Sequence, residues 1–238
     1  MKIAFGFLAV LVLFFACSDA KPKYVAVQKS PTPKQRIDTV YVKDSVVSKE
    51  RLYDNLSKTQ NFKLTYFEKS DGKKPLQHFW TIVIYDKKMK RLDSIVQPVY
   101  VLLSSMVDLN NVRSYATGIN ENMQAPDNYY GDFVVADFNF DAKNDFAILN
   151  DMGGNGGPFY SFYIQQQDKT FSSDRFLQDS MTYFPTKIDK QKQQLVTYVH
   201  AGVCWVGEHK YEKIGNGWKQ VSHKRIDVCD DTKKSGKN

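Results

Sequence analysis

The 238-residue sequence predicts an all-β protein, with an antiparallel β-propeller-like (or sandwich) fold in a single domain. Runs of about five to ten residues rich in Val, Ile, Tyr, Phe and Thr recur along the chain, and clusters of Gly, Asn, Asp or Lys separate them. Aromatic residues make up 14% of the chain, and in such folds they fill the space between neighbouring sheets. We therefore expect many short strands and few helices.

Residues 1–16 are predicted to be a lipoprotein signal peptide. One early Lys precedes an apolar run that ends at Phe14-Phe15-Ala16, directly before Cys17. The run is shorter than the roughly 18–20 residues that a membrane-spanning helix needs. We expect cleavage before Cys17 and lipidation of that residue, with an uncleaved anchor helix as the alternative. The predicted location is the bacterial cell envelope, lipid-anchored to the outer membrane, on its periplasmic face or at the cell surface.

Residues 17–56 are predicted to be the lipidated Cys and a flexible tether. The segment contains three prolines, many Lys and Ser residues, and no sustained apolar periodicity. Residues 57–230 are long enough for one all-β propeller-like domain with a sizeable core, and residues 231–238 are predicted to be a basic disordered tail.

The net charge of the chain is +7, from 33 Lys and Arg against 26 Asp and Glu. Much of the excess lies in the tether and the tail, where it suits an anionic membrane surface beside the lipid anchor. A nucleic-acid partner is not expected, because the chain is predicted to be exported and has no basic helix or recognition motif.

Strand-like runs follow one another through the predicted domain. In chain order they span 62–68, 78–86, 91–103, 111–119, 129–138, 145–149, 158–166, 169–173, 182–189, 194–202, 205–214 and 218–227. Only Asp54–Gln60 and Val99–Asp108 are candidate helices. Asn216-Gly217 predicts a tight hairpin, because both residues tolerate the positive φ of a primed turn.

The stretch DFNFDAKND interrupts two strand-like runs with closely spaced polar residues. The pattern D-x-N-x-D-x-x-x-D places oxygen-bearing side chains at Asp137, Asn139, Asp141 and Asp145. Ca²⁺ takes six to eight such hard oxygens, and three carboxylates this close repel one another unless a cation or protons compensate. We therefore predict a Ca²⁺ loop, in which Lys143 contributes its backbone carbonyl while its ammonium points into water.

This loop is not an EF-hand. Ala142 stands where an EF-hand has Gly, and Ile148 stands where the closing Glu would be. The alternative is an Asx-rich hairpin turn that holds no ion.

A second polar stretch, GGNGGP, separates two other strand-like runs. It is followed by a strand rather than a helix, so it does not fit a phosphate-binding loop. A loop on a rigid scaffold often carries recognition, and we predict that this one contacts a partner. The predicted contact residues are Gly153, Gly154, Asn155, Gly156, Gly157 and Tyr160.

The remaining cysteines and the histidines do not point to catalysis. With Cys17 lipidated, Cys204 and Cys229 remain as an even pair, and we expect a disulfide between them, with two unpaired thiols as the alternative. A bonded Cys204 would supply no thiolate nucleophile. The four histidines lie in separate runs, so a zinc site would need long-range convergence that the spacing does not show.

The ordered series DFVVADFNFDAKNDFAIL, GGNGGPFYSFYI and YEKIGNGWKQV resembles a family of exported β-propeller-like proteins of Gram-negative bacteria. The family includes the immunity proteins of xanthomonad type IV secretion effectors, which are similar to periplasmic I-type lysozyme inhibitors. The resemblance covers residues 130–227 well, and in residues 61–129 it extends only to the spacing of the strand-like runs. It implies a calcium-stabilised, lipid-anchored or periplasmic protein that blocks the active-site cleft of a peptidoglycan hydrolase.

The function expected from the sequence is therefore that of a non-enzymatic lipoprotein that binds and inhibits a peptidoglycan hydrolase. Its expected partners are a cell-wall hydrolase or another envelope protein, and the membrane through its lipid. Because a basic inhibitor is repelled by a basic lysozyme, we expect an acidic or locally acidic target, or contact through a face free of the Lys-rich ends. The alternative is a cell-surface accessory lipoprotein that binds glycan or a protein partner without inhibition.

Overall fold

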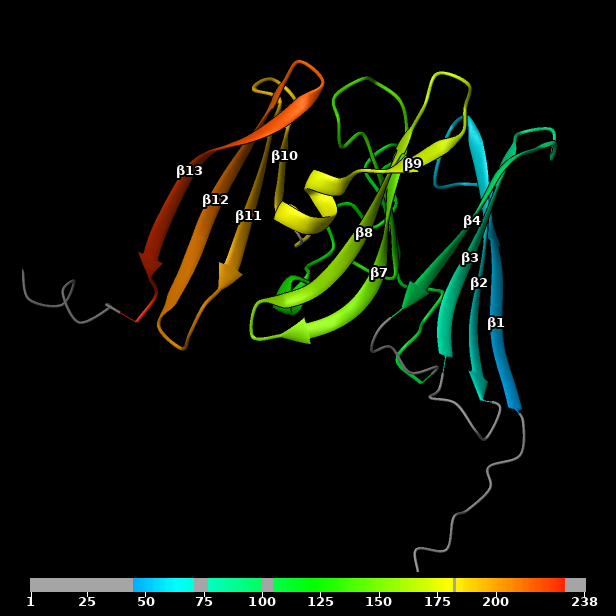
Figure 1. Cartoon of the computed structure of the whole chain (residues 1–238), viewed down its shortest axis with the longest axis horizontal. Helices are drawn as coiled ribbons and strands as arrows, with labels where there is room; N and C mark the ends of the chain where they lie inside the picture. Colours follow the sequence, from blue (N-terminus) through cyan, green and yellow to red (C-terminus); the bar gives the residue numbers. More distant parts are fainter. Residues whose placement is uncertain (1–44, 71–76, 100–104, 182, 230–238) are drawn as a thin grey trace, which may run out of the picture. The chain divides into compact units, whose positions relative to one another are not determined.

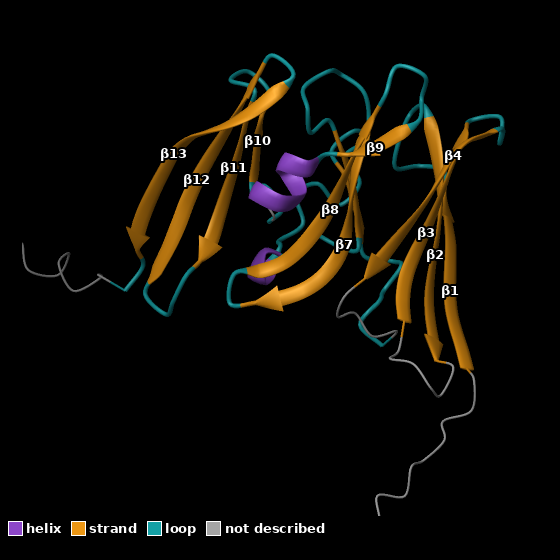
Figure 2. Cartoon of the chain, in the orientation of Figure 1, coloured by secondary structure: helices purple, strands orange, loops and turns teal. Residues whose placement is uncertain are grey.

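The computed structural model describes residues 45–70, 77–99, 105–181 and 183–229 (Figure 1). These residues form three β-sheets and two short helical turns (Figure 2). No helix in the described ranges is long and apolar enough to cross a membrane. The predicted signal peptide, the lipidated Cys17 and the tail 231–238 lie outside the described residues.

The first sheet is antiparallel, with its strands in chain order. It contains β1 (Ser45–Tyr53), β2 (Gln60–Ser70), β3 (Gln77–Asp86) and β4 (Arg91–Val99). Side chains alternate between the two faces of a strand, and the alternating apolar residues of β2 and β3 are fully buried. They are Phe62, Leu64, Tyr66, Trp80, Ile82 and Ile84.

The second sheet is mixed rather than purely antiparallel. It contains β5 (Val112–Ser114), β6 (Phe133–Ala136), β7 (Asp145–Gly154), β8 (Gly157–Gln165) and β9 (Phe171–Ser173). The β5–β6 pair is parallel and the other pairs are antiparallel. A short 3₁₀ turn, η1 (Pro126–Asn128), precedes β6, and a π-helical turn, η2 (Leu177–Met181), follows β9.

The third sheet is antiparallel and again follows chain order. It contains β10 (Lys187–Asp189), β11 (Gln194–His200), β12 (Trp205–Ile214) and β13 (Gly217–Asp227). The predicted hairpin between β12 and β13 is present, but its central residues are Gly215-Asn216, one residue earlier than expected. Ile214 pairs with Gly217, and Gly215 takes the positive φ of 58°.

The three sheets lie side by side in chain order (Figure 1), and aromatic side chains join neighbouring sheets. Phe62 of the first sheet packs against Phe133 of the second at 5.2 Å between ring centroids, and the buried Trp80 indole donates to the Leu149 carbonyl at 2.9 Å. Phe176, which follows β9, stacks on Trp218 of the third sheet. The all-β prediction is confirmed, with a sandwich-like stacking of sheets and no closed barrel among the described strands.

The predicted start of the domain at residue 57 is wrong, because the strand β1 lies within the predicted tether. Lys49 of β1 donates to the Val107 carbonyl at 2.8 Å, the Tyr53 hydroxyl donates to Leu109, and Leu56 is fully buried. These long-range contacts hold β1 in place, although its charged residues did not indicate a strand of the domain.

The helix predicted at Asp54–Gln60 is also wrong. The Ser57 hydroxyl oxygen accepts from the amides of Thr59 and Gln60, at 3.0 and 3.1 Å. Such a local side-chain bond offers the backbone an alternative to a helix, so the segment bends and enters β2. The second candidate, Val99–Asp108, includes residues outside the described ranges, and its first residue ends β4.

Candidate functional site

The loop from Asp137 to Asn144 connects β6 to β7, and Asp145 is the first residue of β7. The Asp137 carboxylate accepts from the amides of Asp141 and Ala142, each at 3.0 Å. The Asn139 side-chain oxygen accepts from the same Asp141 amide at 3.1 Å. The side chains of Asp137 and Asn139, two of the predicted Ca²⁺ ligands, therefore both accept from the Asp141 amide.

Asp145 lies beneath this loop and is fully buried. Its carboxylate accepts from the amides of Phe138, Asn139 and Gln165, at 2.8, 3.3 and 2.9 Å. Burial raises the pKa of Asp145 to about 8, with the Asp141 and Asp137 charges acting in the same direction and the hydrogen bonds opposing them. The side chain holds the loop against β8 from the inside.

The Lys143 ammonium lies at the exposed surface of the loop, where it pairs with Asp141. The Lys143 amide donates to the Asp141 carboxylate at 3.0 Å, and this short turn carries the side chain back over the same residue. The ammonium lies 2.9 Å from the other Asp141 oxygen. Burial acts to raise the pKa of Asp141, but the hydrogen bonds from Lys143 hold that pKa below its ordinary value.

The turns of the loop use left-handed backbone at two residues that are not glycine. Phe140 has a φ of 62° and Ala142 has a φ of 63°, a conformation that glycine adopts without the steric cost of a Cβ. The Phe140 ring lies 6.0 Å from that of Trp218, so the loop also contacts the third sheet.

The donors of the loop fit a hard cation in type, but the described residues do not present a ready-made cluster. Within those residues, no three His, Cys, Asp or Glu side chains group so as to hold a metal ion. The oxygens of Asp137, Asn139 and Asp141 accept from amides within the loop, while those of Asp145 accept from amides of the loop and of β8.

The glycine-rich stretch forms the tip of the β7–β8 hairpin, where Gly154 pairs with Gly157. Gly153, Gly154 and Asn155 are exposed, whereas Gly156 and Gly157 are buried. A Cβ on Gly156 would lie 2.4 Å from the Tyr183 hydroxyl, so only glycine allows this close approach.

The prediction of Tyr160 as a partner-contact residue is wrong. Its side chain is 2% exposed, and its hydroxyl donates to the Gly131 carbonyl while accepting from the Tyr130 amide, both at 3.0 Å. The alternation of β8 turns this ring into the core, against Phe184 at 5.2 Å.

An open groove of about 740 Å³ lies beside the exposed part of the hairpin tip. Three segments far apart in the chain line it, with Pro126, Tyr129, Met152, Asn155, Pro158 and Val203 among its residues. The sequence pointed to the hairpin but missed the walls around η1 and the β11–β12 connection. Neither wall carries a motif, and tertiary folding alone brings them together.

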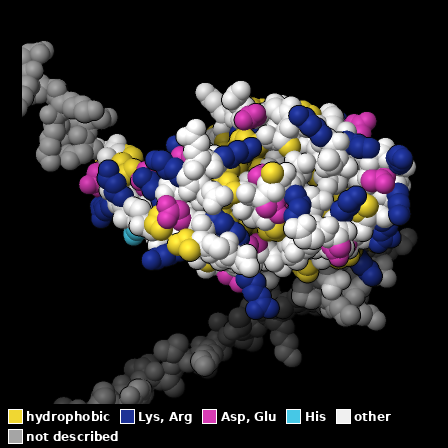
Figure 3. All heavy atoms as spheres, turned by 90° about the horizontal axis from the view of Figure 1, so that it is seen from above, with side chains coloured by type: hydrophobic (Ala, Val, Ile, Leu, Met, Phe, Trp, Pro, Cys, Tyr) yellow, Lys and Arg dark blue, Asp and Glu magenta, His cyan; other side chains and the backbone are white. Residues whose placement is uncertain are grey.

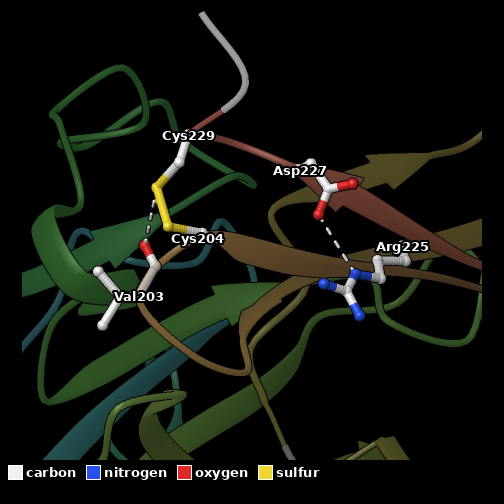
Figure 4. Close-up of a disulfide and its surroundings, with 5 residues drawn as sticks. All are labelled: Val203, Cys204, Arg225, Asp227 and Cys229. Atoms are coloured by element: carbon white, nitrogen blue, oxygen red, sulfur yellow. Dashed lines mark hydrogen bonds and ion pairs between the residues drawn. A yellow bond between two sulfur atoms is a disulfide. The ribbon is translucent and has the colours of Figure 1, made fainter.

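The predicted disulfide between Cys204 and Cys229 is confirmed. It joins the start of β12 to the residues after β13, and the Val203 carbonyl lies beside it at one side of the groove (Figure 4). Structural disulfides persist in oxidising compartments, so the bond indicates an extracytoplasmic protein. With its sulfur bonded, Cys204 offers no thiolate.

Comparison with known proteins finds similarity at the level of structure. No protein-family model and no curated protein sequence matches the chain. A solved structure described as a Xanthomonas type IV secretion system related protein superposes with a TM-score of 0.51, over 77% of this chain and 83% of that one. This chain shares that fold. The two are 17% identical, so the similarity shows the fold alone, and at that level it confirms the predicted relation.

Proposed function

We propose that this chain is a non-enzymatic, lipid-anchored envelope protein that binds a peptidoglycan hydrolase and inhibits it by occluding its active-site cleft. The observation that carries the proposal is the fold shared with a Xanthomonas secretion-related protein, together with the resemblance of residues 130–227 to the immunity proteins of xanthomonad effectors. The disulfide supports a place outside the cytoplasm.

The contact surface in this proposal is the groove together with the exposed residues of the β7–β8 hairpin tip. Gly153, Gly154 and Asn155 are exposed at this tip, so a partner can reach them. Met152 is 36% exposed and Val203 is 93% exposed, so the groove offers apolar area that a partner would cover.

The charge distribution supports contact with targets of either sign. On the face shown in Figure 3, basic and acidic side chains are interspersed. The domain surface seen there does not gather its charge into one basic patch, so long-range repulsion from a basic hydrolase is weaker than the net charge implies.

Inhibition is tested by mixing the purified full chain with C-, G- and I-type lysozymes and secreted hydrolases, and following the clearance of peptidoglycan suspensions. We expect one hydrolase to be inhibited, and Met152→Asp with Val203→Asp to weaken inhibition at least tenfold. The control is Val96→Asp, at a 63% exposed position on β4, which should leave inhibition unchanged. Binding to an envelope protein without inhibition would favour the accessory-lipoprotein alternative, and clearance unaffected across the panel would contradict the proposal.

We also propose that the loop at Asp137–Asp145 binds Ca²⁺ and stabilises the domain. The support is the donor chemistry of Asp137, Asn139 and Asp141, whose side-chain oxygens all accept from backbone amides of one short turn. A ligand that binds only the folded state at one hundred times its Kd stabilises by about 2.7 kcal/mol. We expect the Tm to rise with Ca²⁺ and fall back with EGTA.

The matched control for this test is a second Asx turn in the same chain. Asp168 accepts from the Thr170 amide at 3.0 Å on an exposed turn and lies outside the loop. Asp141→Ala should abolish the rise in Tm with Ca²⁺, whereas Asp168→Ala should retain it. A wild-type Tm that is indifferent to Ca²⁺ would leave the loop as an Asx-rich turn.

A further inference from the structure

The β12–β13 hairpin brings two histidines together that are far apart in sequence. His209 and His223 are direct cross-strand partners, and their rings stack with centroids 4.4 Å apart and planes 12° from parallel. Opposite residues on one face of an antiparallel pair lie close enough for their side chains to share a ligand. A register shift between Lys210 and Tyr211, on the turn side of the histidines, sets this pairing.

Both rings place a nitrogen close to Gly207. A Cβ placed on Gly207 would lie 2.8 Å from Nε2 of His209 and 3.6 Å from Nε2 of His223. Gly207 precedes His209 by two residues on β12, so it belongs to the same face of the sheet. Because Gly207 carries no side chain, both nitrogens can lie close to its backbone without meeting a Cβ.

The basic side chain opposite Gly207 is directed away from the imidazoles. Arg225 is the cross-strand partner of Gly207, but its guanidinium lies over the Trp205 ring at 4.9 Å. Its Nε pairs with Asp227 at 3.3 Å, as Figure 4 shows. The positive charge is thus directed toward the end of the hairpin and not over the imidazoles.

The surroundings also favour an unprotonated His209. Burial and the neighbouring His223 lower the pKa of His209. The Gln220 amide lies 3.4 Å from Nδ1 of His209. Its side-chain nitrogen is the nearer atom, so Gln220 donates to Nδ1, and the proton of a neutral His209 is on Nε2 until a metal ion displaces it.

We propose that His209 and His223 bind one divalent transition-metal ion through their Nε2 atoms, with water completing the coordination. Imidazole suits Zn²⁺, Cu²⁺ and Ni²⁺ and does not suit Ca²⁺, so this site is chemically distinct from the loop at Asp137–Asp145. Two ligands at about 2.0–2.1 Å from one ion lie roughly 3–4 Å apart. Because the rings are stacked 12° from parallel, they have to rotate out of the stack to aim both Nε2 lone pairs at one ion. With two protein ligands, the affinity is lower than that of a closed four-ligand zinc site.

The test measures binding of Zn²⁺ and Cu²⁺ to the full chain by calorimetry and by the Cu²⁺ electron paramagnetic resonance spectrum. We expect a site with nitrogen hyperfine splitting, and an affinity lowered at least tenfold by His209→Ala and by His223→Ala. His200→Ala serves as the control, because His200 is exposed and lies outside the pair; its affinity should match the wild type. Ca²⁺ should not compete.

A second variant keeps both histidines and changes only the space beside them. Gly207→Ala places a methyl group against Nε2 of His209 and is expected to weaken metal binding, with circular dichroism used to check that the variant folds. Absence of Zn²⁺ and Cu²⁺ binding to the wild type, or unchanged affinity in the double His209→Ala, His223→Ala variant, would overturn the proposal. Unchanged affinity in Gly207→Ala would overturn the role given to that glycine.

Discussion

Replacing Asp132 by Asn tests how one buried carboxyl group shapes the pH dependence of folding. Asp132 is fully buried beside β6. One of its oxygens accepts from the Asp108 amide at 2.8 Å and the other from the Tyr129 hydroxyl. Burial raises its pKa from 3.8 to about 7, the Asp108 charge adds to the rise, and the two hydrogen bonds and the Lys49 charge oppose it.

The size and sign of the effect follow from proton linkage. Between pH 4 and 7 the folded state holds the Asp132 proton while the unfolded state has released it, so the free energy of unfolding falls as the pH rises. A difference from 3.8 to about 7 corresponds to about 4 kcal/mol, at about 1.4 kcal/mol per pH unit. The stability contribution is complete below pH 4, is lost as the pH rises through 7, and stays lost above it.

Asn is the informative substitution because it does not ionise and can keep both hydrogen bonds. Its oxygen can accept from the Asp108 amide, and its NH₂ group can donate to the Tyr129 hydroxyl oxygen. Urea unfolding followed by tryptophan fluorescence gives the free energy of unfolding of both proteins at pH 4, 5.5, 7 and 8.5. The stability of Asp132→Asn relative to wild type should rise by about 4 kcal/mol between pH 4 and 8.5. A relative stability that stays constant over this range would refute the reasoning.

Two further substitutions probe the backbone and the covalent link. Ala142→Gly should relieve the φ of 63° and raise the free energy of unfolding by about 1 kcal/mol. The control is Ala147→Gly, at a fully buried position of β7, which should lower the free energy of unfolding in the same denaturant series. A loss of stability in both variants would contradict the strain argument. Replacing Cys204 and Cys229 together by Ser opens a link that spans 25 residues, which should cost about 3 kcal/mol in the chain-entropy estimate. A Tm equal to that of the oxidised wild type would show that the bond adds nothing to stability.

The central strands could be predicted because their burial follows the alternation of the sequence. Phe62, Leu64 and Tyr66 all point into the core from β2, and a two-residue period is what a half-buried strand requires. The strand β1 was missed because Lys49 and Arg51 interrupt its apolar residues. Its position depends on the carbonyls of Val107 and Leu109, more than fifty residues away, which local pattern does not reveal.

At the candidate sites, too, local features could be predicted from the sequence and long-range contacts could not. The residue types of the loop at Asp137–Asp145 could be predicted, since the spacing is local. The inward orientation of Asp145 could not, because it depends on the Gln165 amide of β8. In the same way, the spacing of His209 and His223 shows no metal-binding motif, and only the register of the β12–β13 hairpin makes them neighbours.

The loop at Asp137–Asp145 connects to all three sheets, and this gives its conformation wider consequences. Asn144 donates to the Ser57 hydroxyl at 3.2 Å, just before β2. Asp145 accepts from the Gln165 amide in the second sheet, and Phe140 contacts Trp218 in the third. The side chains of Asp137, Asn139 and Asp141 set the turns of this loop and therefore affect the place where the three sheets meet. This holds whether backbone amides alone or a cation as well contact their oxygens. If Ca²⁺ orders the loop, hydrogen exchange at the Gln165 amide should become slower. An unchanged exchange rate would show that the bound ion does not affect the place where the sheets meet.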